Sequence, residues 1–264
     1  MTRSPFLTCW LIAGLTVLYL PIALLIGTSF NASRLTTQWS GFSLRWYVAM
    51  FHDTALMDAA FLSIRIALVS ATIATLLGGI AGFALARLRR FHGRTLFAGL
   101  LAAPLVLPDL LIGLALLLLF VAAERLTGFP QNRGALTVVL AHATMCIAYV
   151  ALVVESRLAS TGTTLEQVAM DLGAPPFTAF LRITLPLMAP ALLAGWLLAF
   201  TLSLDDVVIA SFTSGPGATT LPMLVFSTLR LGATPILNAL ASLVLALAAG
   251  ALFAAWRLGR ARKY

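Results

Sequence analysis

Six long runs without a charged side chain divide this sequence, and they limit its fold more than any other feature. A helix needs about 20 apolar residues to cross the roughly 30 Å hydrocarbon core of a bilayer. One of the six runs is interrupted by a single aspartate, and all are rich in leucine and alanine, which favours helices over barrel strands. The runs are Ser4–Ser33, Ile66–Ala86, Leu96–Ala123 with Asp109 inside it, Gly134–Val154, Ile183–Leu204 and Leu231–Trp256.

The composition agrees with this pattern, because 61% of the 264 residues are hydrophobic and only 10% are charged. Soluble domains carry about 25% charged residues. We therefore predict an all-α integral membrane protein with one transmembrane domain over residues 1–264. A seventh uncharged run, Val207–Leu229, is broken by SGPGATTLP and is interpreted mainly as a structured loop. The predicted spans are about 7–28, 59–86, 96–122, 134–154, 186–204 and 236–256.

The net charge of +8 suggests a nucleic-acid partner until its placement is considered. With six spans and an inside N-terminus, eleven basic residues fall on the cytoplasmic side and five fall outside, with Arg65 at a span edge. This bias is the positive-inside rule, so both termini are predicted to be cytoplasmic and no nucleic acid is expected. The eleven are Arg3, Arg87, Arg89, Arg90, Arg94, Arg157, Arg182, Arg257, Arg260, Arg262 and Lys263; the five are Arg34, Arg45, Arg125, Arg133 and Arg230.

The first span resembles a retained signal anchor, since it is too long for a secretory signal and lacks a clear cleavage site. The segment Asn31–Asp58 is then outside, where Trp39, Trp46 and Tyr47 favour anchoring at the lipid headgroups over docking of an external partner. Cys9 and Cys146 both fall within predicted spans and indicate neither a disulfide framework nor a metal site.

The segment Thr163–Pro186 has the pattern of two short helices joined by a sharp turn. Thr163 and Glu166 match a capping box at the first helix start. Gly173 is placed to end that helix, and Pro176 to begin the second. Each helix has an apolar side, which a plain connector between spans does not need. Pro186 suits the first turn of the next long helix, and the predicted topology puts the segment inside the cell, within reach of a partner protein.

The third span carries two prolines, Pro104 and Pro108, which remove successive backbone bonds and bend or break the helix. Asp109 follows directly, so it is either a carboxylate that faces a wet path or the cap of a second half-helix, and the sequence leaves both open. His142 in the fourth span is interpreted as a residue that hydrogen-bonds between helices rather than as a ligand. Gly78, Gly79 and Gly82 in the second span predict close helix approach.

The fifth span ends at Asp205 and Asp206, which point in different directions on a helix and so do not form an acid–base pair. They either attract a cation or form a solvated helix end. No nucleotide-binding GxxxxGK[ST] motif, catalytic set or metal-ligand cluster is found in the sequence. The chain is therefore predicted to be non-catalytic.

The segment Thr163–Pro186 resembles the EAA loop of permease subunits in bacterial ABC importers. That loop has the pattern E-A-A, three residues, Gly, nine residues and I-x-L-P. Here Gln167-Val168-Ala169 is followed by Met170-Asp171-Leu172, Gly173 and, nine residues later, Ile183-Thr184-Leu185-Pro186. The spacing is complete, and the departure is Gln167 in place of the usual Glu, with Glu166 one position earlier. Stretches such as APLVLPDLLIGLALLLLF and AFTLSLDDVVIASFTSGPGATTLPMLVFS resemble the polyamine branch of these permeases.

The resemblance implies the six-helix type I ABC importer permease fold and a bacterial inner-membrane location. It implies a second permease subunit, two ATPase subunits that hold ATP and Mg, and a periplasmic polyamine-binding protein, with no cofactor on this chain. The loop residues would couple to the ATPase as a pair of coupling helices. The implied coupling residues are Glu166, Gln167, Ala169, Asp171, Gly173, Ile183, Leu185 and Pro186.

The resemblance also implies putrescine as the cargo, and a dication needs carboxylates or aromatic faces along its path. The candidates are Asp109, Tyr149, Trp196, Asp205 and Asp206, with Asp205 and Asp206 preferred because they lie near the expected outer mouth. Two alternatives remain. One is an ABC permease for spermidine or another small solute, and the other is an ion-coupled secondary transporter, which the lack of an evident inverted repeat disfavours.

Overall fold

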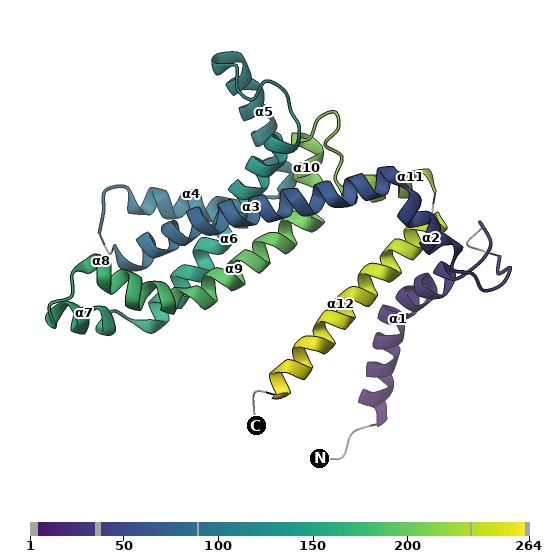
Figure 1. Cartoon of the computed structure of the whole chain (residues 1–264), viewed down its shortest axis with the longest axis horizontal. Coiled ribbons are helices and arrows are strands. Elements are labelled where there is room, and N and C mark those ends of the chain that lie inside the picture. The colour runs from purple at the N-terminus through teal and green to yellow at the C-terminus, as the bar shows by residue number, and fades with distance from the viewer. Residues whose placement is uncertain (1–4, 35–37, 89, 233, 262–264) are drawn as a thin grey trace. The chain divides into compact units, whose positions relative to one another are not determined.

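The computed structural model describes residues 5–34, 38–88, 90–232 and 234–261. Apart from one antiparallel bridge between Asn31 and Phe42, these residues form helices and turns, which confirms the all-α fold class (Figure 1). The elements are α1 (Pro5–Ser29), α2 (Arg45–His52), α3 (Thr54–Arg87), α4 (Arg94–Val106), α5 (Asp109–Thr127), α6 (Ala135–Thr161), α7 (Thr164–Asp171), α8 (Pro176–Ala179), the π turn η1 (Phe180–Thr184), α9 (Leu185–Asp205), α10 (Val208–Thr213), α11 (Leu221–Leu231) and α12 (Pro235–Ala261).

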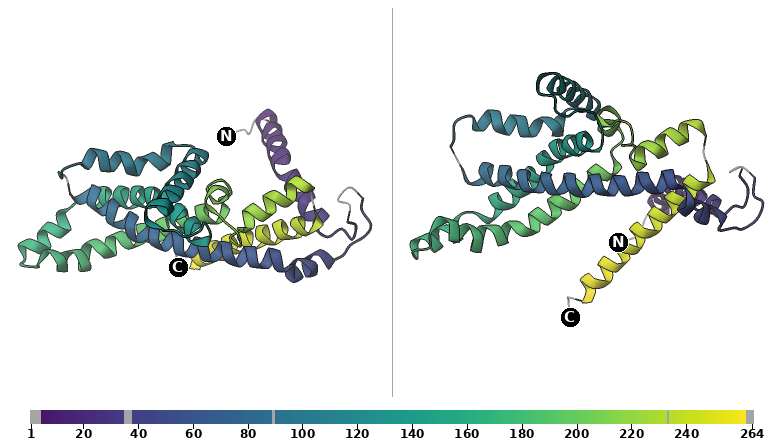
Figure 2. Two further views of the ribbon diagram at one scale, coloured as in Figure 1. Left: turned by 90° about the horizontal axis from the view of Figure 1, so that it is seen from above. Right: turned by 45° about the horizontal axis from the view of Figure 1, so that its top comes forward.

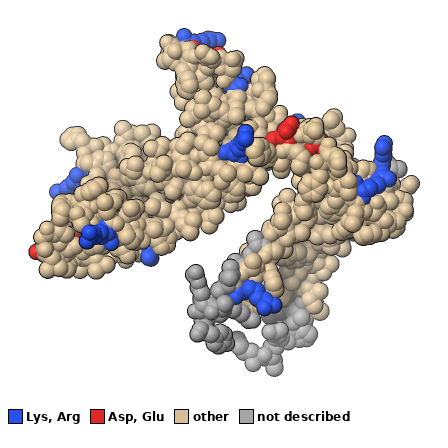
Figure 3. Space-filling view, in the orientation of Figure 1, with Lys and Arg blue, Asp and Glu red and all other residues tan. Residues whose placement is uncertain are grey.

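Six helical stretches in the described part of the chain are long and apolar enough to cross a membrane, which confirms the predicted number. Figure 3 shows uncharged atoms over most of the face it presents. Four residues of the predicted cytoplasmic charge, Arg3, Arg89, Arg262 and Lys263, lie outside the described residues. The stretches are Cys9–Ser29, Thr54–Arg87, Asp109–Thr127, Ala135–Thr161, Pro176–Asp205 and Pro235–Ala254.

The third predicted span, 96–122, is not one helix, because the chain breaks between α4 and α5. Leu107 takes an extended conformation (φ −76°, ψ 140°), as the residue before a proline tends to do. Pro108 then precedes the new helix, and its carbonyl accepts from the N–H groups of Leu111 and Ile112. Pro104 lies inside α4 without ending it. The 19-residue helix α5 is therefore the membrane-length element, and α4 is a shorter apolar helix.

The run Val207–Leu229 contains more helix than the predicted loop. Its first part is α10, its last part belongs to α11, and only residues 214–220 between them are irregular. The glycines and prolines of SGPGATTLP therefore break the helix only locally, while the apolar residues on both sides remain helical. The backbone N–H of Leu221 donates to Ser63 Oγ at 2.7 Å, which holds the start of α11 against α3.

The structure divides into two compact units, residues 1–58 with 225–264 and residues 59–224, and the divisions fall inside α3 and α11. In the unit 59–224, α3, α6 and α9 pack side by side (Figure 2). A Cβ on Gly78 would lie 2.8 Å from the Ile147 carbonyl oxygen, and one on Gly82 would lie 2.5 Å from that of Ala151. The two glycines thus allow the close approach of α3 and α6 that the sequence predicted.

In the other unit, α1 and α2 pack against α12. Trp46 is buried and its indole N–H donates to the Asn31 carbonyl at 2.7 Å. The hydroxyl groups of Tyr47 and Ser29 are also 2.7 Å apart. The prediction of headgroup anchoring is therefore wrong for Trp46, whose polar atom satisfies an internal carbonyl, whereas Trp39 is exposed.

Candidate functional site

The segment Thr163–Pro186 forms the predicted helix, turn and helix, with α7 before the turn and α8 after it. Gly173 has φ +88°, a left-handed conformation that suits glycine. Its N–H donates to the Met170 carbonyl at 2.9 Å, and the N–H of Ala174 donates to the Ala169 carbonyl at 3.0 Å. This pair of bonds is a Schellman motif, which satisfies the last carbonyls of α7 and reverses the chain.

The predicted capping box is absent at the start of α7. Thr163 is the N-cap residue, but its side chain makes no capping bond. Glu166 turns instead toward Arg87 at the end of α3, whose Nη2 lies 2.9 Å from Glu166 Oε1. The same carboxylate oxygen accepts from Thr184 Oγ1 at 2.8 Å. The arginine competes successfully for the carboxylate, because a charged partner binds it more strongly than a neutral N–H.

The apolar sides of this segment are largely uncovered within the unit. Leu172 is 83% exposed and Phe177 is 71% exposed, and Leu165 and Val168 are exposed as well. α7 contributes no buried residue to the core. Exposed apolar patches outside the lipid mark interaction sites in many proteins. The segment therefore has the surface of a docking element, and Gln167 and Asp171 are exposed on the same helix.

The second helix of the segment does not stop before the next span. α8, η1 and α9 continue into one another, so Pro186 lies within a continuous helix rather than at the start of a separate one. The N–H of Leu185 donates to the Phe180 carbonyl, five residues earlier, and Pro186 then has no N–H to donate. The π turn therefore accommodates the proline, and Pro176–Asp205 forms one continuous helical rod that is long enough to cross the membrane.

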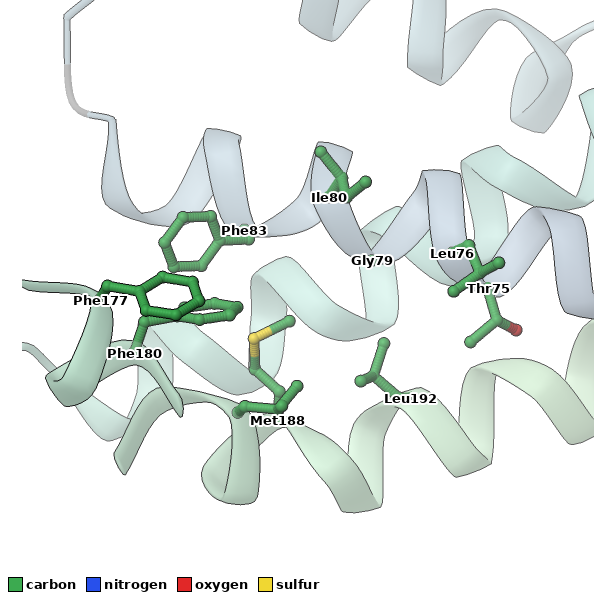
Figure 4. A pocket seen from close by; sticks show the side chains of 10 residues that line it. Thr75, Leu76, Gly79, Ile80, Phe83, Phe177, Phe180, Met188 and Leu192 are labelled. Carbon is green, nitrogen blue, oxygen red and sulfur yellow. The ribbon is translucent and has the colours of Figure 1, made fainter. Parts of the chain in front are cut away.

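An apolar cavity of about 550 Å³ separates the base of this rod from α3. Figure 4 shows Phe177, Phe180 and Met188 on one side of it, facing Phe83 and Gly79 on the other. Phe83 and Phe180 meet edge to face, with ring centroids 5.3 Å apart. Aromatic contact thus bridges α3 and η1 at one end of a space that is otherwise open.

The structure places the three candidate carboxylates near the far ends of α9 and α5. Asp205 is the last residue of α9 and Asp109 the first of α5, and both are exposed. Asp109 belongs to the first turn of α5, where a carboxylate complements the helix dipole. Asp109 thus begins a second half-helix as predicted, but it does not cap it, because Pro108 is the N-cap residue and no side chain makes a capping bond. Its exposure leaves it available to a cation.

Asp206 differs from Asp205, because its side chain is only 7% exposed and both of its carboxylate oxygens accept hydrogen bonds. Its carboxylate accepts from the backbone N–H groups of Ile209 at 3.3 Å and Ala210 at 2.7 Å, which caps α10. His142 Nε2 lies 3.2 Å from the same carboxylate, though without hydrogen-bond alignment. His142 Nδ1 lies 2.7 Å from Ser203 Oγ, so this histidine does bond between helices as predicted.

The sequence indicated His142 and Asp206 separately, but not that the imidazole of His142 lies between Ser203 and Asp206. No local pattern signals the cluster, because His142 and Ser203 are 61 positions apart.

The two aromatic candidates lie elsewhere. Trp196 stacks on Phe200 and its indole N–H lies 3.2 Å from Thr72 Oγ1. It precedes Asp205 by nine residues, about 13 Å along the helix axis.

Tyr149 is half-buried against the core of the same unit. It lies seven residues after His142 on α6, about 10 Å along the axis. Neither aromatic candidate therefore adjoins the carboxylates. Among the residues that the structure describes, no group of three His, Cys, Asp or Glu side chains is placed to hold a metal ion.

The six membrane-length helices and the helical segment outside them define a multi-pass, all-helical membrane protein. Its fold is similar to that of a chain in the crystal structure of a bacterial ABC transporter involved in the import of the acidic polysaccharide alginate. The TM-score is 0.65 at 15% identity, and the match covers 98% of each chain. This likeness is one of fold alone.

Sequence comparison adds the family. Residues 74–258 match the pattern of the binding-protein-dependent transport system inner membrane component, and the chain belongs to this family of transport permease subunits. It is 53% identical to the putrescine transport system permease protein PotI of Escherichia coli K12, over the whole chain and 94% of PotI. It is 41% identical to the spermidine/putrescine permease protein PotC of Haemophilus influenzae, over 87% of each, and 39% identical to that of E. coli K12, over 94% of this chain and 89% of the relative.

Proposed function

We propose that this chain is the permease subunit of an ATP-driven importer and forms, with a second permease subunit, the membrane path for putrescine. The single observation that carries the proposal is the segment Thr163–Pro186, a helix pair that exposes apolar side chains and continues directly into a membrane-length helix. Membership of the transport family and 53% identity to PotI support it. Similarity to the spermidine/putrescine permeases makes spermidine the second candidate cargo.

The partners follow from this role. Two ATPase subunits hold ATP and Mg, and a periplasmic binding protein delivers the polyamine. Eleven basic residues against five support cytoplasmic termini in the inner membrane and put the segment on the ATPase side. Its exposed residues Gln167, Asp171 and Leu172 form the docking face. The remaining coupling residues shape the segment: Glu166 binds Arg87 and Thr184, Ala169 and Gly173 form the turn, and Ile183, Leu185 and Pro186 connect it to α9.

The path for a dication requires accessible negative charge at the opposite end. Asp205 and Asp109 meet this requirement because both side chains are exposed. Asp206 has its carboxylate occupied by α10 and His142, so it organises this end rather than meeting the cargo. Cargo specificity rests mainly with the binding protein, and these carboxylates form a weak passing site.

The first test is uptake of labelled putrescine by cells with and without this chain, all partner subunits present, repeated after ATP depletion. Loss of uptake in both cases, with weak competition from unlabelled spermidine, supports the proposal. Strong competition by spermidine makes the chain a general polyamine permease. Uptake that survives ATP depletion but collapses with the ion gradient would establish a secondary transporter instead.

The second test changes the turn of the docking segment. Gly173→Pro imposes φ near −65° where the chain has +88°, and removes the N–H that donates to Met170. We expect normal membrane levels with loss of ATP-driven uptake. The matched control is Gly128→Pro, since Gly128 has φ +73° and donates to Glu124 in the same way at the end of α5. Equal loss of uptake in both variants at equal protein levels contradicts the coupling role of the segment.

A further inference from the structure

The guanidinium group of Arg87 joins three parts of the unit 59–224 at the end of α3. Its Nη1 donates to the Leu158 carbonyl at 3.0 Å and its Nη2 to the Gly162 carbonyl at 2.8 Å, both at the end of α6. Its Nε and Nη2 donate to Glu166 Oε1 on α7 at 3.1 and 2.9 Å. The side chain is 9% exposed. One rigid, planar group therefore fixes α3, α6 and α7 together.

The contact continues beyond Glu166. Its carboxylate, 13% exposed, also accepts from the hydroxyl of Thr184, which is buried in the π turn ahead of α9. The chain of polar contacts thus runs from α3 through Arg87, Glu166 and Thr184 to the membrane-crossing rod. We call these three residues the lock.

The lock matters more to α7 than a surface ion pair would, because little else holds this helix. α7 has no buried residue, and a cleft of about 240 Å³ opens beside it, lined by Glu166, Gln167 and Met170 with Phe83 and Thr184. Exposed ion pairs contribute little to stability, but removing one partner of a shielded pair leaves a charge without compensation. The orientation of α7 therefore depends on polar contacts that can be removed one at a time.

We propose that Arg87 and Glu166 are positioning residues that transmit displacement of α7 to α3, α6 and α9. The inference rests on the proposed function, in which α7 docks on the ATPase, and it assigns to Glu166 an internal role rather than a contact with the ATPase. Thr184 completes the lock at the base of α9. Without the lock, the ATPase still binds and moves α7, but α3, α6 and α9 move less in response.

The experiment uses the complete importer with its ATPase and binding protein, reconstituted in lipid vesicles. Putrescine uptake and ATP hydrolysis are measured in the same preparation for Arg87→Gln, Glu166→Gln and the double variant. We expect uptake per ATP hydrolysed to fall about tenfold in each single variant, on the scale of a lost charged hydrogen bond. The double variant should equal the single variants, since contacting residues that act as one unit are not additive.

The matched control is Arg90→Gln, which removes the same charge from an exposed position three residues after Arg87. It should leave uptake per ATP unchanged. A purely structural role predicts that uptake and hydrolysis fall together with the amount of assembled complex, at a constant ratio, and that result overturns the proposal. So does an equal fall in the ratio for Arg90→Gln, or a double variant whose loss is the product of the single losses.

Thr184→Val decides the question if the charge variants fail to assemble, because it removes one hydroxyl and keeps the shape. A severalfold fall in uptake per ATP supports the lock, with recovery in Thr184→Ser, and an unchanged ratio overturns it. Wild-type vesicles without ATP-driven uptake would refute the proposed function instead. Hydrogen exchange of α7 in the purified chain would then test the lock: faster exchange in Arg87→Gln than in Arg90→Gln supports it, and equal rates overturn it.

Discussion

Replacing each of the two adjacent aspartates with alanine should separate structural support from cargo contact. In Asp206→Ala the backbone N–H groups of Ile209 and Ala210 lose their acceptor, and both residues have 0% exposure. Loss of a helix cap costs about 0.5–2 kcal/mol, and a buried donor without a partner costs about 1–3 kcal/mol. We therefore expect Asp206→Ala to lower the free energy of unfolding by roughly 2–4 kcal/mol. Asp205→Ala removes an exposed carboxylate at a helix end, where substitutions change stability by about 0.5 kcal/mol or less.

Two measurements on the same variants test this separation. Thermal unfolding of the purified chain in detergent should show a midpoint on the order of 5–15 °C lower for Asp206→Ala, at about 2–4 °C per kcal/mol, and nearly unchanged for Asp205→Ala. The KM of putrescine uptake should respond in the opposite way: it should rise about tenfold for Asp205→Ala and stay nearly unchanged for Asp206→Ala. Asp206→Asn should recover part of the midpoint, because the amide oxygen still accepts one N–H.

Equal midpoints for Asp206→Ala and Asp205→Ala would contradict this separation, since the buried N–H groups would then not depend on Asp206. The separation also fails if Asp206→Ala raises KM at unchanged stability, because its carboxylate would then meet the cargo directly. Asp109→Asn provides an independent check of the path. A rise in KM similar to that of Asp205→Ala is expected, because Asp109 is likewise an exposed carboxylate.

Four further substitutions, one of them a control, test the packing around these sites by thermal unfolding in detergent. Gly82→Ala should destabilise the protein by about 1–3 kcal/mol, because the new Cβ would lie 2.5 Å from the Ala151 carbonyl oxygen. The control Gly99→Ala in α4 meets nothing within 4 Å and should stabilise by up to about 1 kcal/mol. A change in stability of the same sign in both variants would refute the close packing of α3 on α6. Ser203→Ala should cost about 1–3 kcal/mol by leaving the buried imidazole of His142 without its 2.7 Å partner, and a neutral effect would show that this bond does not form. Trp196→Phe should cost only about 0.5–1.5 kcal/mol, since it loses the bond to Thr72 Oγ1, and a larger loss would point to contacts beyond that bond.

The spans could be predicted because they depend on composition alone. An unbroken run of about 20 apolar residues is long enough to cross the bilayer as a helix, whereas the run Val207–Leu229 is broken by glycines and prolines. The number of spans therefore follows without knowledge of packing. The break at Pro108 needed more, since Pro104 and Pro108 have the same chemistry and only one of them interrupts the helix. The difference lies in the conformation of Leu107, which tertiary structure selects from the two that the sequence allows.

Glu166 illustrates why the site was harder to predict than the fold. Its spacing from Thr163 satisfies a local capping pattern, but Arg87, 79 positions away, offers a stronger partner. A sequence pattern describes neighbours along the chain, and it cannot rank them against a charged group that folding brings in. The same limit applies to His142 and Ser203, whose contact depends on the packing of α6 against α9.

The contact between Arg87 and Glu166 and the contact between His142 and Asp206 lie at opposite ends of the packed pair α6 and α9. Arg87 and Glu166 meet where α6 ends and the rod of α9 begins, and His142 and Asp206 meet near the start of α6 and the end of α9. The 21 residues of α9 span about 30 Å between these ends. Between them the interface is a buried apolar core, which is densely packed in proteins and transmits displacement rather than absorbing it. Under the proposed function, one packed pair therefore joins the lock on the ATPase side to the carboxylates of the path. Substitutions that weaken the contacts at one end should reduce transport and leave the contacts at the other end intact.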